Sequence, residues 1–320
     1  MRGLIRDRIA AVIGSTPQDL GDAANLGQVA GSLAVTTDSF VVSPLFFPGG
    51  DIGSLAVFGT VNDLAVAGAK PLWLTLSLII EEGLPLATFD RVINSIASAA
   101  KQCDVRIVAG DTKVVSAGAA DKLFINTTGV GQLAEPALAG AARIEVDDVL
   151  LASGPIGKHG IAVMSERHNL GFTPPPESDS APIHEATAAL HRALGNDLAA
   201  MRDATRGGIA AVMHEWAEDS GKTMAVRESA IPVSGDVRGA CELLGLDPLY
   251  VANEGTFLAA VRLHASDRAL ELLRSFTQFH SAVAIGRASA AMNSPVVIQR
   301  LLGSLQPVDE PAGAPLPRIC

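Results

Sequence analysis

The stretch that decides the fold is Val105-Arg106-Ile107-Val108-Ala109-Gly110-Asp111-Thr112-Lys113. Its apolar first half, residues 105–109, is typical of a buried strand, and the Gly-Asp-Thr-Lys that follows predicts a turn at the end of that strand. The residues before it predict a helix from Thr88, as N-cap, to Cys103. Another apolar strand, Lys122–Val130, comes after it. This order indicates a mixed α and β domain whose polar residues gather at the ends of its elements.

The same alternation of strands and helices extends in both directions. Upstream, the pattern predicts helices over residues 1–13 and 53–67 and strands over 32–37 and 72–80. Downstream, it predicts strands over 149–153, 223–226, 257–261, 282–285 and 296–298, and helices over 183–194, 209–219, 234–244 and 266–276. The character of the sequence changes around residues 140–148. We therefore expect an N-terminal domain over residues 1–140, a C-terminal domain over 141–300 and a flexible tail over 301–320.

The composition fits this size and excludes several classes of protein. The chain has 320 residues, of which 48% are hydrophobic, so it can bury the cores of two domains. No apolar run is long enough to span a membrane, and no signal peptide follows Met1. The net charge is −10 and no basic stripe is present, which argues against nucleic-acid binding. The cysteines, Cys103, Cys241 and Cys320, are odd in number and far apart, so we expect a reducing, cytoplasmic setting without disulfides.

The clearest chemical signal is a set of aspartates at predicted turns and element ends. The sequence has no P-loop, no G-x-S-x-G motif and no zinc-ligand spacing. Carboxylates at element ends are what Mg²⁺ requires when it lies between a protein and nucleotide phosphates. Each aspartate alone is better explained as a cap or turn residue. The set comprises Asp22, Asp38, Asp63, Asp111 and Asp203.

Two of these aspartates have neighbours that strengthen the phosphate hypothesis. Asp111 is followed by Lys113, which can neutralise phosphate. Asp203 begins Asp-Ala-Thr-Arg-Gly-Gly at the start of a predicted helix, where free N–H groups and the helix dipole attract anions. A further glycine-rich loop, residues 153–160, has the composition of a phosphate or substrate loop. Its histidine, His159, is equally well explained as a structural hydrogen-bonding group.

The chain ends on a cysteine that follows several prolines. Pro307, Pro311, Pro315 and Pro317 exclude a helix and a central strand, so we expect an extended arm with a thiol at its tip. Such a thiol can carry a covalent group into a site. An incidental tail cysteine is the alternative for Cys320 considered alone.

Taken together, these motifs resemble HypE, the carbamoyl dehydratase family of [NiFe]-hydrogenase maturation, from about Leu33 to Cys320. The matching stretches are Thr37-Asp38-Ser39, Pro44 to Gly50, Asn62-Asp63, Gly110 to Val115, Asp121 to Thr127, Asp203 to Gly208, Cys241 to Asp247, Ala252-Asn253-Glu254-Gly255 and the terminal Pro-Arg-Ile-Cys.

The resemblance implies an α+β, two-domain PurM-like fold of the aminoimidazole-ribonucleotide-synthetase-like superfamily. It implies an N-terminal domain that pairs into a β-barrel homodimer, a C-terminal α/β sandwich and an extended tail. It also implies ATP and Mg²⁺, a HypF carbamoyltransferase that loads the tail cysteine, and a HypC–HypD iron scaffold that receives the cyano group.

The resemblance further implies roles for individual residues. The implied catalytic residues are Cys320, Lys113 and Glu254. The implied ATP and phosphate ligands are Asp38, Asn62, Asp63, Asp111, Thr112, Asp203, Arg206, Gly207 and Gly208. The implied metal ligands are Asp22, Asp38, Asp63 and Asp203. For Glu254, the residues alone favour a turn salt bridge.

One departure from the family concerns the start of the sequence. The family has a glycine-rich His-Gly-x-Gly-Gly segment that closes over the nucleotide, whereas this sequence begins Met1-Arg2-Gly3. Weaker nucleotide binding is therefore expected.

Two other functions fit parts of the pattern: a kinase or synthetase of the same superfamily that acts on a free small molecule, and a non-enzymatic carrier with a tail thiol. The tail speaks against the former and the aspartates against the latter.

Overall fold

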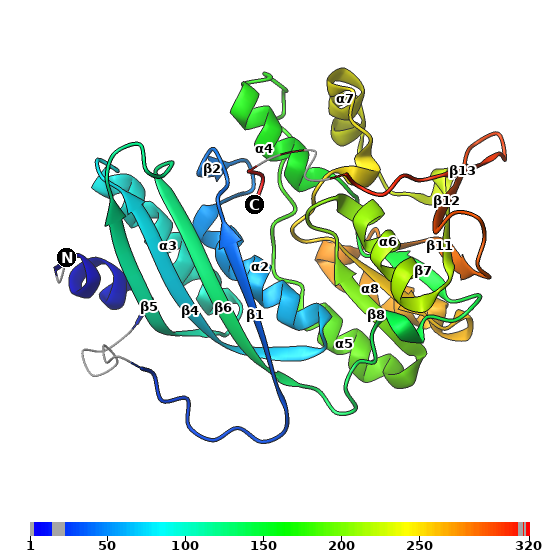
Figure 1. Cartoon of the computed structure of the whole chain (residues 1–320), viewed down its shortest axis with the longest axis horizontal. Helices are drawn as coiled ribbons and strands as arrows, with labels where there is room; N and C mark the ends of the chain where they lie inside the picture. The colour runs from blue at the N-terminus through cyan, green and yellow to red at the C-terminus, as the bar shows by residue number, and fades with distance from the viewer. Residues whose placement is uncertain (1–2, 15–22, 313–315, 317) are drawn as a thin grey trace.

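Two β-sheets organise the chain, one in each half (Figure 1). The computed structural model describes residues 3–14, 23–312, 316 and 318–320. The α+β architecture expected from the sequence is confirmed. No helix in the described part of the chain is both long and apolar enough to cross a membrane.

The N-terminal half is a four-stranded sheet with helices on one face. Its strands lie in the order β1 (Leu33–Phe40), β6 (Leu123–Leu133), β4 (Ala69–Glu81) and β5 (Arg106–Val115). In Figure 1 this sheet lies in front of α2 (Ile52–Val66) and α3 (Leu86–Gln102). The short strands β2 (Phe46–Phe47) and β3 (Gly50–Asp51) precede α2, and the helical segments η1 (Leu4–Ala10) and α1 (Ala11–Ile13) pack against α3.

Helix α2 is almost entirely apolar, and this explains why it is the central buried helix of the N-terminal half. Asp51 caps its start by accepting hydrogen bonds from the N–H groups of Gly53 and Ser54, at 2.7 and 3.2 Å. The only charged residue within the helix is Asp63. The fold therefore holds one carboxylate near the end of an otherwise apolar element.

The opposite face of this sheet is not covered by any described element. Exposed and half-exposed residues alternate along β1, and Leu33 and Val35 are 50% and 71% exposed. Ile79 of β4 is also 40% exposed on this face, whereas its neighbour Ile80 is buried on the helix side. A sheet face with exposed aliphatic residues is typical of an interface.

The C-terminal half is a seven-stranded sheet between layers of helices. The strand order is β13 (Leu305–Pro307), β12 (Val296–Gln299), β9 (Thr223–Arg227), β11 (Val283–Ser289), β7 (Val149–Ala152), β10 (Phe257–Val261) and β8 (Leu198–Asp203). Helix α6 (Gly208–Ser220) covers one face, and α5 (His184–Leu194) and α8 (Ser266–Arg274) cover the other. Helices α4 (Lys158–His168) and α7 (Gly235–Leu244) pack together at one end.

Several predicted boundaries are wrong for physical reasons. Helix α3 begins at Leu86 after Pro85, so Thr88 is not its N-cap. Strand β1 continues to Phe40, which places Asp38 inside the strand. Strand β5 continues to Val115, because its parallel pairing with β4 does not stop at Ala109. Residues 110–113 are therefore part of a strand and do not form a turn.

The tail is more ordered than predicted. Strand β13 pairs antiparallel with β12, so the chain is not a free arm from residue 301 onward. Pro307 is tolerated because β13 is the edge strand of the sheet. The last residues return to the space between the two halves, where Figure 1 marks the C-terminus beside β2. There Ile319 is buried in the core of the N-terminal half.

Candidate active site

A cavity of about 620 Å³ lies between the two halves. Its walls come from β1 and the end of α2 on one side and from β8 and α6 on the other. Its lining includes six residues singled out in the sequence: the charged Asp38, Asp63, Asp203, Arg206 and Glu254, and the thiol of Cys320. The tertiary fold therefore brings together six residues that are spread over almost 300 positions of the sequence.

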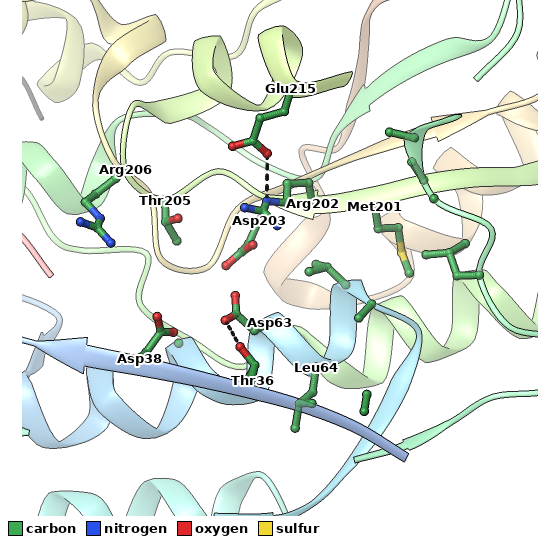
Figure 2. Close-up of a pocket in the computed structure, with 18 of the residues that line it drawn as sticks. Thr36, Asp38, Asp63, Leu64, Met201, Arg202, Asp203, Thr205, Arg206 and Glu215 are labelled. Atoms are coloured by element: carbon green, nitrogen blue, oxygen red, sulfur yellow. Dashed lines mark hydrogen bonds and ion pairs between the residues drawn. The ribbon is translucent and has the colours of Figure 1, made fainter. Parts of the chain in front are cut away.

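Three aspartates from different elements converge in this cavity. Figure 2 shows the carboxyl groups of Asp63 and Asp203 pointing toward one another, with Asp38 beside them. Asp38 comes from β1, Asp63 from α2 and Asp203 from the last position of β8. Thr36 orients Asp63 by donating a hydrogen bond to its Oδ2 at 2.8 Å. The prediction that Asp203 lies at the start of a helix is close, because α6 begins five residues later.

Two of these aspartates, Asp38 and Asp203, have a raised pKa. Burial and the neighbouring charge of Asp63 raise the pKa of Asp38 to about 6. Burial, again followed by the charge of Asp63, raises the pKa of Asp203 to about 7. Arg206 and Arg202 oppose the shift at Asp38. A cluster of partly protonated carboxyls is what close negative charges produce when no cation lies between them.

Glu254 is the most deeply buried acid of the cavity. It is 3% exposed, and its Oε1 has no hydrogen-bond partner among the described residues. Burial, followed by the charge of Asp203, raises its pKa well above the ordinary value. A buried carboxyl oxygen without a partner is costly unless a ligand meets it. Glu254 therefore has the environment of a functional acid or base and not that of a turn salt bridge.

The loop that carries Glu254 is held from both halves of the molecule. Asp179 accepts hydrogen bonds from the N–H groups of Glu254 and Gly255, both at 3.1 Å. Asn62 donates to the carbonyl oxygen of Glu254 at 3.1 Å. Glycine is required at position 255, because a Cβ there would lie 1.8 Å from the carbonyl oxygen of Asp179. The backbone thus fixes where the Glu254 carboxyl points.

Asn62 is a structural residue and not a phosphate ligand, which corrects the prediction for it. It is 1% exposed. Its Nδ2 also donates to Ala181 O at 3.0 Å, and its Oδ1 accepts from Ile183 N at 3.0 Å. All its polar atoms are therefore used to join α2 to the segment before α5.

Cys320 lies at the cavity beside Glu254. Burial, followed by the charge of Glu254, raises the pKa of the Cys320 thiol to about 12, against a smaller opposing effect of Arg206. The docked thiol is therefore protonated at neutral pH. Arg206 itself is exposed on the rim of the cavity, where a phosphate can reach it.

The two glycines before α6 allow close approach of other backbone. Gly208 has φ +59°, and a Cβ there would lie 2.4 Å from Leu249 O. Its N–H donates to Thr205 O at 2.9 Å, and the predicted role of Gly208 in phosphate binding stays a prediction. A Cβ at Gly207, φ +77°, would lie 3.3 Å from Pro311 of the tail. Both glycines thus serve to pack the helix start against its neighbours.

Asp111, Thr112 and Lys113 do not reach this cavity within one chain. They belong to β5, whereas Asp38 belongs to β1, and these strands are opposite edges of the sheet. Asp111 and Lys113 pair with Ser77 and Ile79, so they point to the uncovered face, away from α2. The misplaced strand end explains the difference, because residues in a turn could have bent toward the other aspartates.

The predicted metal ligands are only partly placed together. Asp22 lies outside the described residues. Within the described ranges, no three His, Cys, Asp or Glu side chains form a group that could hold a metal ion by themselves. Asp38, Asp63 and Asp203 line one cavity. They therefore fit a cation only if other oxygen atoms, such as those of phosphates, complete its coordination.

Sequence reasoning missed residues that contribute through the fold. Asp179 lies in a proline-rich surface loop and carries no local signal of its contact with Glu254. Arg202 and Glu215, which form an ion pair of 3.5 Å, line the cavity beside Asp203 (Figure 2). The charged Arg202, which follows the apolar residues 198–201, was the one available clue.

Known proteins resemble this chain along almost its whole length. Residues 20–133 match the family model "AIR synthase related protein, N-terminal domain", and residues 145–298 match the corresponding C-terminal domain. The chain is 48% identical over 291 residues to carbamoyl dehydratase HypE of Bradyrhizobium diazoefficiens, which covers 91% of this chain and 84% of that protein.

Solved structures agree with these matches. A HypE crystal structure in complex with ATP is 40% identical, with a TM-score of 0.94 over 100% of this chain and 96% of that chain. A HypE–HypF complex is 43% identical, with a TM-score of 0.84 over 96% of this chain and 99% of that chain.

Proposed function

The chain belongs to the HypE family of carbamoyl dehydratases, and we propose that it removes water from a carbamoyl group carried on Cys320, using ATP, to leave an S-bound cyano group. The observation that supports this most is the position of Cys320 beside Glu254, in the cavity that the three aspartates also line. Cys320 packs partly against the core of the N-terminal half, but packing alone does not require its thiol to face an acidic cavity. A role as the carrier of the reacting group explains that position chemically.

The reaction assigns a task to each part of the cavity. The carbamoyl oxygen attacks the γ-phosphorus of ATP, and ADP leaves. The C–O bond then breaks with departure of phosphate, while the nitrogen loses its two protons and C≡N forms. The oxygen of the carbamoyl group thus leaves in phosphate, which is a far better leaving group than hydroxide. Glu254, in its ionised form, is our candidate to accept an N–H proton, because its side chain lines the cavity and interacts with the Cys320 thiol.

ATP fits the charge pattern of the cavity when a cation accompanies it. The charge of Asp63 raises the pKa of both Asp38 and Asp203, and a divalent cation relieves that repulsion. We propose that these three residues hold Mg²⁺ together with phosphate oxygens, and that Arg206 contacts a phosphate. Mg²⁺ would supply charge neutralisation at the phosphates.

The uncovered face of the four-stranded sheet supports a homodimer. Two such sheets can close into a barrel that buries Leu33, Val35 and Ile79. If the two-fold axis runs along that barrel, β5 of a second copy lies beside β1. This arrangement brings Asp111, Thr112 and Lys113 of the second copy to the edge that carries Asp38. We propose that these residues act across the dimer, with Lys113 at the γ-phosphate.

Mixed dimers test this arrangement. Lys113→Ala and Cys320→Ala chains are each expected to be inactive alone. When they are combined, the heterodimer is expected to regain activity in one of its two sites, because that site receives both wild-type residues. Mixed dimers that form and stay inactive would contradict action across the interface.

The Cys320 thiol has to react with partner proteins outside the cavity. With a pKa of about 12, Cys320 is not a nucleophile inside the cavity. We therefore propose that a HypF carbamoyltransferase loads Cys320 when the tail is outside, and that a HypC–HypD iron complex receives the cyano group. The three free cysteines support a reducing, cytoplasmic setting.

An ATPase assay on the dimer separates this proposal from its alternatives. Phosphate release that occurs only after carbamoylation of Cys320 is the expected result. Turnover of Cys320→Ala with a free small-molecule acceptor would instead support a kinase or synthetase. No turnover of the carbamoylated protein would support a non-enzymatic carrier.

A further inference from the structure

One helix contacts two consecutive carbonyl groups at the end of the chain. Arg167, in the last turn of α4, donates from Nη2 to the carbonyl oxygen of Arg318. The same oxygen also accepts the Ser43 N–H at 3.3 Å. His159, in the first turn of α4, contacts the carbonyl oxygen of Ile319 through Nε2 at 2.9 Å. The next residue is Cys320.

The hydrogen bonds of His159 fix its protonation. A carbonyl oxygen only accepts hydrogen bonds, so Nε2 must carry the hydrogen. Nδ1 lies 2.8 Å from Ser178 Oγ and therefore accepts the Ser178 hydroxyl hydrogen. Ser178 Oγ in turn accepts the Ser180 N–H at 3.0 Å. Burial lowers the pKa of His159, and this favours the same neutral form.

The ring of His159 has little freedom to move. It is fully buried, and the ring of Phe47 packs against it edge-to-face with centroids 5.3 Å apart. Phe47 belongs to the N-terminal half and His159 to the C-terminal half. The histidine is therefore held by both halves while it holds the tail.

We propose that His159 is the positioning residue of the reaction: its Nε2–H holds the Ile319 carbonyl and so sets the Cys320 sulfur against Glu254, with Arg167 holding the preceding carbonyl. This clamp recognises main-chain atoms, so it binds the tail whether or not Cys320 carries a group. Its role in turnover rests on the proposed function, whereas its role in docking does not.

The test measures alkylation of Cys320 by iodoacetamide, followed by peptide mass spectrometry of the full chain. His159→Leu removes the donor and is expected to raise the Cys320 alkylation rate about tenfold, the equilibrium effect of losing one hydrogen bond. His159→Gln retains an N–H donor and is expected to stay closer to the wild type. Cys103 and Cys241 are buried and report unfolding in the same digest.

The chain offers a matched control in His214. Its Nε2 also contacts a main-chain carbonyl oxygen, that of Val308, at 3.0 Å, but this contact lies upstream of the docked residues. His214→Leu is expected to leave the Cys320 rate unchanged. If His159→Leu exposes all three cysteines, Ser178→Ala takes its place in the test. Ser178→Ala removes the hydrogen-bond partner that fixes the His159 tautomer. It is expected to raise the alkylation rate of Cys320 and to leave Cys103 and Cys241 protected.

Turnover provides the second measurement. Carbamoylated His159→Leu is expected to dehydrate its group more slowly than carbamoylated wild type in a single turnover, with recovery in His159→Gln. Unchanged Cys320 alkylation in a folded His159→Leu or Ser178→Ala variant would overturn the clamp. An inactive wild type with a normal alkylation pattern would instead refute the proposed function and leave the clamp supported.

Discussion

Asp203→Asn should change how the stability of the protein depends on pH. The pKa of Asp203 is about 7 in the folded chain, whereas the ordinary value for an aspartate is 3.8. Because the folded pKa is raised, the contribution to stability is fully present below about pH 4 and is lost as the pH rises through 7. The full loss is about 4 kcal/mol, at about 1.4 kcal/mol per pKa unit. Roughly 3 kcal/mol of it falls between pH 5 and pH 8.

The assay is urea unfolding at pH 5 and pH 8 in EDTA, followed by tryptophan fluorescence. Trp216 reports on the site, because it is buried on α6 and lines the cavity. Asparagine has the shape of aspartate and does not titrate. The unfolding free energy of wild type is therefore expected to fall between the two pH values by roughly 3 kcal/mol more than that of Asp203→Asn.

The control is Asp267→Asn, which removes an exposed carboxylate from the first turn of α8. It is expected to keep the wild-type difference between the two pH values. If the unfolding free energies of wild type and Asp203→Asn fall by the same amount between the two pH values, the pKa of Asp203 is not raised as we state. The case for a cation among the three aspartates would then fail as well.

Three further predictions concern the tail and the Glu254 loop. Cys320→Ala is expected to abolish cyano-group formation. It is also expected to change the unfolding free energy by less than about 1 kcal/mol, because only one small group is removed. A large loss of unfolding free energy in calorimetry would instead show that the thiol is structural. Gly255→Ala is expected to lower the unfolding free energy by about 3 kcal/mol through overpacking, as measured by urea unfolding. Gly154→Ala is the control and should be tolerated, because its Cβ would lie 3.5 Å from Thr256 Oγ1. Equal losses of unfolding free energy in the two variants would contradict the close approach at Gly255. The docked thiol has a pKa of about 12, so at pH 8 it should react with iodoacetamide about a thousandfold more slowly than a free cysteine. Its alkylation rate should still rise with pH at pH 10. A plateau of the rate near pH 9 would mean that the tail is undocked.

The site can be predicted from the sequence where its signals are local. Asp203 precedes a glycine pair and a helical pattern, and the structure places it at the cavity. Asp38 and Asp63 also lie there, although Asp38 is inside a strand and not after it. The helices and strands of the C-terminal half follow clear apolar periodicities, and for this reason most of them are predicted within a few residues.

The predictions that fail concern residues whose contacts are with parts of the chain far away in the sequence. Residues 110–113 read as a turn, but pairing with β4 keeps them in a strand, and strand order puts them at the far edge. Asn62 looks like a polar ligand beside Asp63, yet main-chain groups 119 or more residues away use it. His159 binds a carbonyl oxygen 160 residues later. No local pattern encodes an interaction with main-chain atoms that are distant in the sequence, because every residue offers the same ones.

The mass of the C-terminal peptide during one turnover tests the central claim most directly. The protein is first carbamoylated on Cys320 and then given ATP and Mg²⁺, and the peptide that ends at Cys320 is followed by mass spectrometry. We predict that this peptide loses the mass of one water in step with phosphate release, and that Glu254→Gln greatly slows the loss. A carbamoyl group that stays intact while phosphate is released, or that leaves Cys320 before it is dehydrated, would contradict the account.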